Sequence, residues 1–187
     1  MHPFSNHPFH IRHDLEFSEL VDSISESGII TPIIVRPKVG VGYEVISGHR
    51  RWEACKELGI ESIPARVEYI DDDEATILMV NSNIQREHVL PSEKAFAYKM
   101  RMEALKHQGR TTLAQVGPKF SSEKIAAETG DSRNQVKRYI RLTYLIPSIL
   151  QMVDDGRIAF NPAVEISYMT EEHQTWLKEE MDMSDAT

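Results

Sequence analysis

The sequence has one cysteine and no long apolar run. A lone cysteine cannot form an internal disulfide, which excludes a disulfide-stapled secreted fold and fits a reducing cytosol. Because no segment approaches the length of a membrane span and no signal peptide opens the chain, we expect a cytoplasmic protein. Cys55 falls on the apolar face of an expected helix, so we interpret it as a packing residue rather than a nucleophile.

Basic residues are also scarce: 21 Lys and Arg stand against 29 Asp and Glu, for a net charge of −8. As a single number this argues against binding to nucleic acid. The charge is uneven, however, because residues 99–141 hold ten Lys or Arg and only four acids. The segments before and after them are both acidic. The local field of residues 99–141 predicts where an anionic partner would bind.

The first 90 residues show the alternation of an α/β unit. We expect residues 1–16 to be irregular, with His2, His7, His10 and His13 at the surface rather than binding a metal. A helix capped by Ser18 is expected to end at Gly28. The expected strands are 33–36, 43–47 and 63–70, and the expected helices are 50–58 and one that starts at Asp71–Asp73.

Beyond residue 90 only helical signals remain. Pro91 and Ser92 open a longer helix, and glycines and a proline in 107–120 predict a loop. Further helices are expected at about 122–129, 132–145, 148–154, 162–168 and 171–181. The sequence thus predicts an α+β protein, with a small α/β domain over residues 1–90 and an all-helical domain over residues 91–187.

The stretch 43–58 (YEVISGHRRWEACKEL) predicts a strand, a turn at Gly48 and a helix that opens with Arg50 and Arg51. Free amides at a helix N-terminus attract anions, and two arginines add charge and forked donors. This turn is therefore a candidate phosphate site. A tight turn with two solvated arginines would explain G-x-R-R alone equally well.

A second polar cluster, Asn83-Ile84-Gln85-Arg86, strengthens the first. Asn, Gln and Arg can present polar groups to a phosphate or to a hydrated Mg²⁺, which needs few protein ligands when phosphate oxygens are present. By itself this cluster would be interpreted as a polar helix end. The turn at Thr31-Pro32 is a third candidate part of the same pocket.

Residues 122–142 (SEKIAAETGDSRNQVKRYIRL) fit a helix-turn-helix. Ala126 is small where two helices pack closely, Gly130 permits the turn, and Ser132 can cap the second helix. That helix offers Arg133, Asn134 and Gln135 for base edges, as the N-terminal part of a recognition helix does. Lys137, Arg138 and Arg141 are suited to phosphates. An ordinary helical hairpin is the alternative, and the local positive charge favours DNA binding.

Several blocks in a fixed order resemble the ParB/RepB family of partition proteins. They are GIITPIIVR, YEVISGHRRWEACKELG, IPARVEYIDDDEA and NIQREHVLPSEKAFAY, followed by the helix-turn-helix. The resemblance covers roughly residues 7–170. It implies an N-terminal domain that binds CTP with Mg²⁺, a helix-turn-helix domain that recognises a centromere-like DNA site, and a homodimer that closes as a sliding clamp. It also implies slow CTP hydrolysis and an ATPase partner of the ParA type.

Carried over by position, the resemblance assigns the nucleotide to residues of the three polar blocks. These are Thr31, Gly48, His49, Arg50, Arg51, Asn83, Gln85 and Arg86, with Asn83 also holding Mg²⁺. It assigns no catalytic residue. The predicted DNA-binding residues are Ser132, Arg133, Asn134, Gln135, Lys137, Arg138 and Arg141.

Two departures from the family pattern concern the metal. The family commonly has Glu where this chain has His49 and Ser82, and losing both carboxylates weakens the expectation of metal binding and hydrolysis more than that of nucleotide binding. The loop at 107–120 is longer than is usual in the family. We do not expect the family's C-terminal dimerisation domain within these 187 residues.

Two other functions remain open at this point. One is a site-specific regulator of a mobile element, with a degenerate N-terminal domain that binds no nucleotide. The other is an enzyme, because the ParB-like N-terminal fold resembles sulfiredoxin and some small kinases. Sulfiredoxin chemistry requires a cysteine at the phosphate turn, where this chain has Ser47, so the enzyme ranks last.

Overall fold

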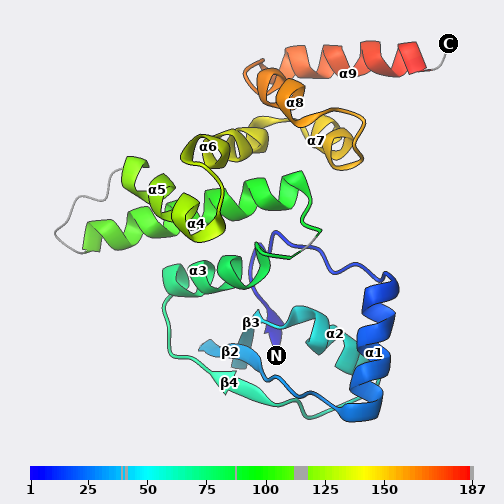
Figure 1. Cartoon of the computed structure of the whole chain (residues 1–187), viewed down its shortest axis with the longest axis vertical. Helices are drawn as coiled ribbons and strands as arrows, with labels where there is room; N and C mark the ends of the chain where they lie inside the picture. Colours follow the sequence, from blue (N-terminus) through cyan, green and yellow to red (C-terminus); the bar gives the residue numbers. More distant parts are fainter. Residues whose placement is uncertain (39, 41, 87, 112–117, 186–187) are drawn as a thin grey trace. The chain divides into compact units, whose positions relative to one another are not determined.

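The computed structural model describes residues 1–38, 40, 42–86, 88–111 and 118–185, and it divides into two compact units (Figure 1). The first unit, Met1–Asn83, contains a mixed sheet and three helices in its described part. The second unit, Ile84–Thr187, is helical in the residues described. The predicted α+β class is confirmed.

The sheet has four strands in the order β1-β3-β2-β4. These are β1 (His2–Pro3), β2 (Ile33–Lys38), β3 (Gly42–Ser47) and β4 (Ala65–Val67). The central strands β2 and β3 pair antiparallel, which places Arg36 opposite Glu44. At the two edges of the sheet, β1 pairs in parallel with β3, and β4 pairs in parallel with β2. The chain's second and third residues therefore belong to the sheet, and the prediction of an irregular start was wrong there.

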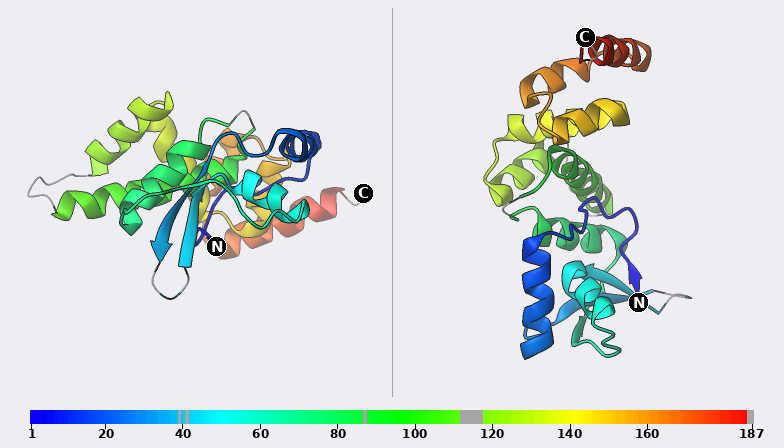
Figure 2. Two further views of the ribbon diagram at one scale, coloured as in Figure 1. Left: turned by 90° about the horizontal axis from the view of Figure 1, so that it is seen from below. Right: turned by 90° about the vertical axis from the view of Figure 1, so that its right-hand side faces the viewer.

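Each face of the sheet is covered by different helices. On one face, Ile33, Val35 and Val45 pack with Trp52 of α2 (His49–Glu57). The helix α1 (Leu15–Ser27) lies beside α2, as Figure 2 shows. The opposite face meets α3 (Asp72–Asn83).

Ion pairs hold the face toward α3. Arg36 Nε donates to Glu44 Oε2 at 2.7 Å, Lys38 Nζ donates to Glu44 Oε1 at 2.7 Å, and Arg36 Nη2 reaches Asp72 Oδ1 at 2.5 Å. Glu44 is only 2% exposed. Although burial opposes it, the hydrogen bonds and charges of Lys38 and Arg36 lower the pKa of Glu44.

Helix α1 begins earlier than the sequence indicated. Asp14 is its N-cap and accepts a hydrogen bond from Phe17 N at 3.0 Å, so the predicted cap at Ser18 was wrong. The reason is that Phe17 is already buried and starts the inner face of the helix. β4 is also shorter than predicted, since only Ile33–Val35 of β2 pair with it.

The second unit opens with the long helix α4 (Pro91–Thr111) and continues with α5 (Pro118–Thr129) and α6 (Arg133–Arg141). The loop predicted for 107–120 was wrong at both ends, and 112–117 lie outside the described residues. Pro118 misled the prediction because a proline needs no amide donor in the first turn of a helix and can open one as well as break one.

The remaining elements complete the helical unit. They are the 3₁₀ turn η1 (Leu142–Tyr144), α7 (Pro147–Asp154), α8 (Phe160–Ile166) and α9 (Glu171–Asp185). The predicted helix 132–145 is thus shorter, with a 3₁₀ turn after Arg141. A cluster centred on Leu142, Ile149 and Val153 forms the core. Gln174 of α9 is buried against it, and its Oε1 accepts from Ile146 N at 2.9 Å.

Candidate functional site

The turn between β3 and α2 requires glycine. Gly48 has φ of +97°, and a Cβ there would lie 2.7 Å from Ile33 Cγ2. A larger residue would therefore be strained and would clash with the sheet. As the N-cap of α2, Gly48 offers no side chain to bind the first amides of the helix, which leaves them suited to an anion.

Arg50 lies beside this N-terminus and is held by acids of α1. Its Nη2 is 3.3 Å from Asp14 Oδ1, and its Nη1 is 3.3 Å from Glu16 Oε2. The guanidinium also lies 6.0 Å from the centre of the Phe17 ring. An incoming phosphate would therefore replace two carboxylates at Arg50.

Arg51 is held by backbone carbonyls instead. Its Nη1 donates to the carbonyl of Thr31 and, at 3.1 Å, to that of Pro32. Burial lowers the pKa of Arg51, but a guanidinium keeps its charge at neutral pH. The structure thus brings Thr31, Gly48, Arg50 and Arg51 into one region of the first unit.

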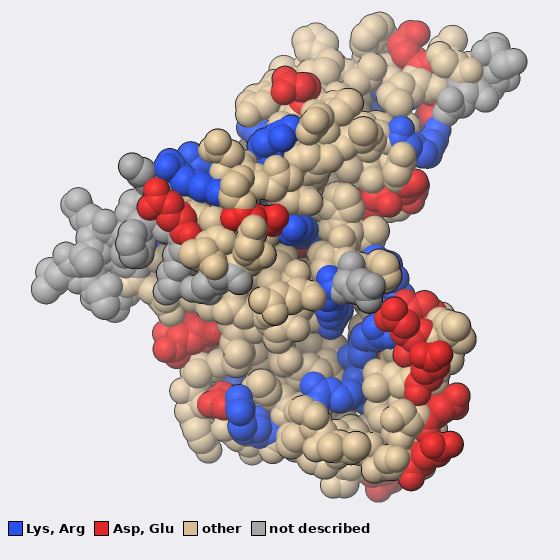
Figure 3. All heavy atoms as spheres, viewed as in Figure 1, with Lys and Arg blue, Asp and Glu red and all other residues tan. Residues whose placement is uncertain are grey.

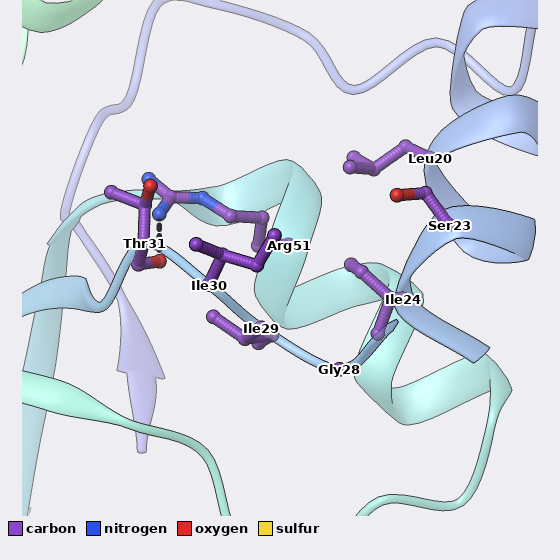
Figure 4. A pocket seen from close by; sticks show the side chains of 8 residues that line it. All are labelled: Leu20, Ser23, Ile24, Gly28, Ile29, Ile30, Thr31 and Arg51. Atoms are coloured by element: carbon purple, nitrogen blue, oxygen red, sulfur yellow. Dashed lines mark hydrogen bonds between the residues drawn. The ribbon is translucent and has the colours of Figure 1, made fainter. Parts of the chain in front are cut away.

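A pocket of about 370 Å³ opens next to Arg51 (Figure 4). Thr31 and Arg51 line one side of it, and Ser23 contributes a hydroxyl from α1. Its other lining residues are Leu20, Ile24, Gly28, Ile29 and Ile30. A mainly apolar pocket beside a cationic turn has the chemistry to take a ring with a charged tail.

His49 does not face this pocket openly, because it is only 4% exposed. Its ring lies 4.1 Å from that of His7, and His7 Nδ1 is 2.8 Å from the carbonyl oxygen of Phe9. His7, predicted as a surface residue, is half-buried, because the N-terminal segment folds back over the turn. His2, His10 and His13 are exposed as expected.

The assigned metal ligand, Asn83, is 2% exposed at the end of α3. Its Nδ2 donates to Met79 O at 2.7 Å and to Ser82 Oγ at 3.1 Å. Mg²⁺ is usually held by carboxylates, and no group of three or more His, Cys, Asp or Glu in the described part of the chain could hold a metal. These residues do not fit a resident Mg²⁺ ion. Gln85 and Arg86 belong to the second unit.

In the second unit, α5 and α6 form the predicted helix-turn-helix. Gly130 has φ of +76° in the turn, and its N donates to Ala126 O at 3.1 Å. Ser132 caps α6 by accepting from Gln135 N at 3.1 Å, as predicted. Ile125 and Val136 are fully buried between the helices.

Side chains of α4 bind the turn between α5 and α6. Lys94 Nζ is 2.7 Å from Asp131 Oδ2, and the Tyr98 hydroxyl donates to the same carboxylate. Burial and the Asp131 charge raise the pKa of Tyr98, so its hydroxyl stays a donor. Asp131 immediately precedes the cap of α6, and this anchor sets the direction in which α6 leaves the turn.

The polar side chains of α6 differ in their freedom. Asn134 and Lys137 are exposed, Gln135 is half-buried, and Arg133 Nη1 lies 3.4 Å from Glu123 Oε1. Arg138 and Arg141 both bind residues from beyond the helix-turn-helix. The DNA roles assigned to these side chains stay predictions.

The Arg141 side chain is bound by other residues of the second unit. Its Nε donates to Ser167 Oγ at 3.1 Å and its Nη2 to Ser167 O at 2.6 Å. The guanidinium also contacts the rings of Tyr144 and Tyr168, 4.5 and 4.1 Å from their centres. These contacts join the end of α6 to the end of α8.

Sequence reasoning missed every partner that lies far along the chain. Asp14 and Glu16 at Arg50 are 36 and 34 residues away, and Asn161 at Arg138 is 23 residues away. No local pattern marks such pairs. The one usable signal was the excess of acids in α1, which Figure 3 shows gathered over that helix.

No helix in the described ranges is both long and apolar enough to cross a membrane.

Comparison with known proteins adds sequence evidence. The family model described as the ParB N-terminal domain matches residues 3–84. The chromosome-partitioning protein Spo0J of Thermus thermophilus is 35% identical over 162 residues, covering 86% of this chain and 55% of that protein. A probable chromosome 1-partitioning protein ParB of Deinococcus radiodurans is 31% identical over 164 residues, covering 88% and 52%. The chain spans about half the length of these curated relatives.

A solved structure gives the same result for the fold. The C-terminally truncated chromosome-partitioning protein ParB from Caulobacter crescentus, complexed to the centromeric parS site, has a TM-score of 0.56. It is 24% identical, and the match covers 88% of this chain and 79% of that one. Sequence and fold agree, and the chain belongs to the ParB family.

Proposed function

We propose that the chain binds a specific double-stranded DNA site through α5 and α6 and acts in the partition of a chromosome, plasmid or mobile element. The observation that carries this proposal is the recognition helix α6, capped by Ser132 and packed through Val136, with Asn134 and Lys137 exposed. Its N-terminal residues suit base edges and its cations suit phosphates. The Caulobacter relative's complex with a centromeric site supports this kind of DNA.

The proposal extends to the assembly. Paired DNA half-sites are usually bound by a two-fold symmetric dimer, so we propose that two copies of the chain bind one site. A ParA-type ATPase partner belongs to the same proposal. The net positive segment 99–141 supplies the attraction that would bring the acidic chain to DNA.

We further propose that the first unit binds CTP. The triphosphate would lie at the N-terminus of α2, against Gly48, Arg50 and Arg51, and the nucleoside in the adjoining pocket lined by Thr31. The glycine turn, the two arginines and the size of the pocket support a nucleoside triphosphate; the choice of CTP rests on the family resemblance.

Mg²⁺ would be bound by phosphate oxygens of the nucleotide, because the described residues offer no cluster of carboxylates that could hold it. We therefore expect nucleotide binding to persist, though weakened, when EDTA removes Mg²⁺. No hydrolytic step is assigned to any residue.

One observation favours a second candidate function, a DNA-binding regulator that uses no nucleotide. Asp14 and Glu16 already neutralise Arg50, and His7 covers His49. In such a protein these contacts would be permanent parts of the fold.

The test measures the melting temperature of the chain with each of the four ribonucleoside triphosphates. A ligand that binds only the folded state raises it. A rise with CTP alone supports the CTP proposal, and no rise with any nucleotide supports the regulator. Arg50→Ala should remove the rise and weaken binding about tenfold or more, because a charge-assisted contact to phosphate is lost.

Lys56→Ala is the matched control, since Lys56 lies on the same helix but pairs with Glu53 at 2.5 Å and lies over Trp52. It should leave CTP binding unchanged. A normal response to CTP in Arg50→Ala would remove Arg50 from the site.

A further inference from the structure

The start of α8 forms a corner beside the recognition helix. Asn161 is exposed there and Phe160 is half-buried, in a helix that packs against α6. Neither residue belongs to the helix-turn-helix. Phe160 is itself fixed, because its ring lies 4.6 Å from that of Tyr139.

This corner holds Arg138. The Nη2 of Arg138 donates to Asn161 Oδ1 at 2.6 Å, and its guanidinium lies 5.2 Å from the centre of the Phe160 ring. Asn161 thus sets the direction of the guanidinium fork, and the Phe160 ring supports its position. The acceptor is a neutral amide, so the positive charge of Arg138 is kept.

The contact contributes little to the fold, because hydrogen bonds between exposed groups are weak. Its main effect is to restrict the orientations that the Arg138 side chain can take. An arginine that is already held loses less rotamer freedom on binding than a free one does. A phosphate accepts from many directions, whereas the O6 and N7 of guanine accept a fork in one plane. Holding the fork therefore favours a base over a phosphate.

We infer that Arg138, oriented by Asn161 and Phe160, recognises a guanine edge in the major groove. Asn161 is then a positioning residue for sequence specificity, outside the helix-turn-helix. This inference rests on the proposed DNA-binding function. It changes the role that the sequence assigned to Arg138, from a phosphate contact to a base contact.

The experiment first selects preferred duplexes from a random pool with the full chain. Affinities for the preferred duplex and for a random duplex are then measured for the wild type, Asn161→Ala and Arg138→Ala. We expect Asn161→Ala to lose about tenfold on the preferred duplex, with the random-duplex affinity, the salt dependence and the melting temperature unchanged. Gln151→Ala, which removes an exposed amide from α7, is the control and should change neither affinity.

Two further arms separate positioning from folding. Asn161→Asp keeps an oxygen acceptor and should keep the ratio of the two affinities, even if its charge weakens both. Replacing one guanine of the preferred site by 7-deazaguanine should weaken the wild type but add nothing to the loss in Arg138→Ala.

Equal losses on preferred and random duplexes in Asn161→Ala, or no loss at all, would overturn the inference while leaving DNA binding intact. A wild type that binds the random pool without preference would overturn the inference and the proposed site-specific function together. A lower melting temperature in both Asn161→Ala and Arg138→Ala would show that the contact has a structural role, and it would overturn the inference.

Discussion

Two arginines of each unit are held in different ways. In the first unit, Arg36 and Arg50 are bound by carboxylates, whereas in the second, Arg138 and Arg141 are bound by a neutral amide and by the oxygens of Ser167. Arg51 is also bound by neutral carbonyls. A carboxylate cancels the positive charge, while a neutral acceptor only directs it.

This difference separates the two proposed anion sites. At Arg50 a phosphate must exchange for acids, so binding there can be selective and reversible without a strong general attraction. At Arg138 and Arg141 the positive charge remains, so in the proposed function DNA would be attracted before any specific contact forms. The difference would also let an acidic chain carry the proposed cationic surface for DNA. Each prediction below tests one side of it.

The largest effect is expected where a carboxylate partner is buried. Glu44→Gln should destabilise the first unit by roughly 3–5 kcal/mol, because it leaves the buried Arg36 charge with less compensation. Ser167→Ala should cost the second unit only about 1–2 kcal/mol, because it removes one hydrogen bond from the Arg141 guanidinium and leaves the bond to the Ser167 carbonyl in place. Denaturant unfolding measures both: Trp52 fluorescence in a Trp176→Phe background follows the first unit, and Trp176 fluorescence in a Trp52→Phe background follows the second.

The same experiment has a pH dependence. The pKa of Glu44 is lowered on folding, so its contribution is complete above the unfolded pKa and is lost as pH falls through the folded pKa. The first unit should therefore lose stability in acid, and Glu44→Gln should lose less than the wild type. Equal acid sensitivity in both proteins would contradict the importance of this ion pair.

An intermediate effect should distinguish Arg141 from Lys137. Arg141→Ala should destabilise the second unit by about 1–2 kcal/mol, because hydrogen bonds and two aromatic contacts are lost. Lys137→Ala should leave stability within about 0.5 kcal/mol and reduce the salt slope of DNA binding by about 1. A stable Arg141→Ala protein with a reduced salt slope would instead make Arg141 a phosphate contact.

The smallest effect concerns the acids at Arg50. Glu16→Gln should raise the affinity for tripolyphosphate about twofold to threefold, because an exposed ion pair that competes with the ligand is worth at most about 1 kcal/mol. Glu16 is preferred to Asp14 for this test because Asp14 also caps α1. Glu19→Gln, an exposed acid one turn further along α1, should give a much smaller gain measured by calorimetry. Equal gains from both would indicate general repulsion rather than competition.

Local signals in the sequence predicted the local structure well. The strand, glycine turn and helix around Gly48 and the Ser132 cap each depend on residues within a few positions of one another. Two of the predictions that failed, at Ser18 and over 107–120, concerned signals with two meanings. A serine or a proline is compatible with more than one place in a helix, and the burial of Phe17 decided the first case.

The sequence by itself determined the two-part α+β plan, the glycine turn proposed to bind phosphate and the capped helix proposed to recognise DNA, because spacing, caps and glycine positions act through neighbouring backbone atoms. The tertiary structure alone decided which oxygen each arginine binds: Asp14 and Glu16 for Arg50, Asn161 for Arg138, and Ser167 for Arg141. These partners lie 23 to 36 residues away, and only packing brings them together. A charged side chain on a surface has many possible partners of similar energy, and the fold selects one.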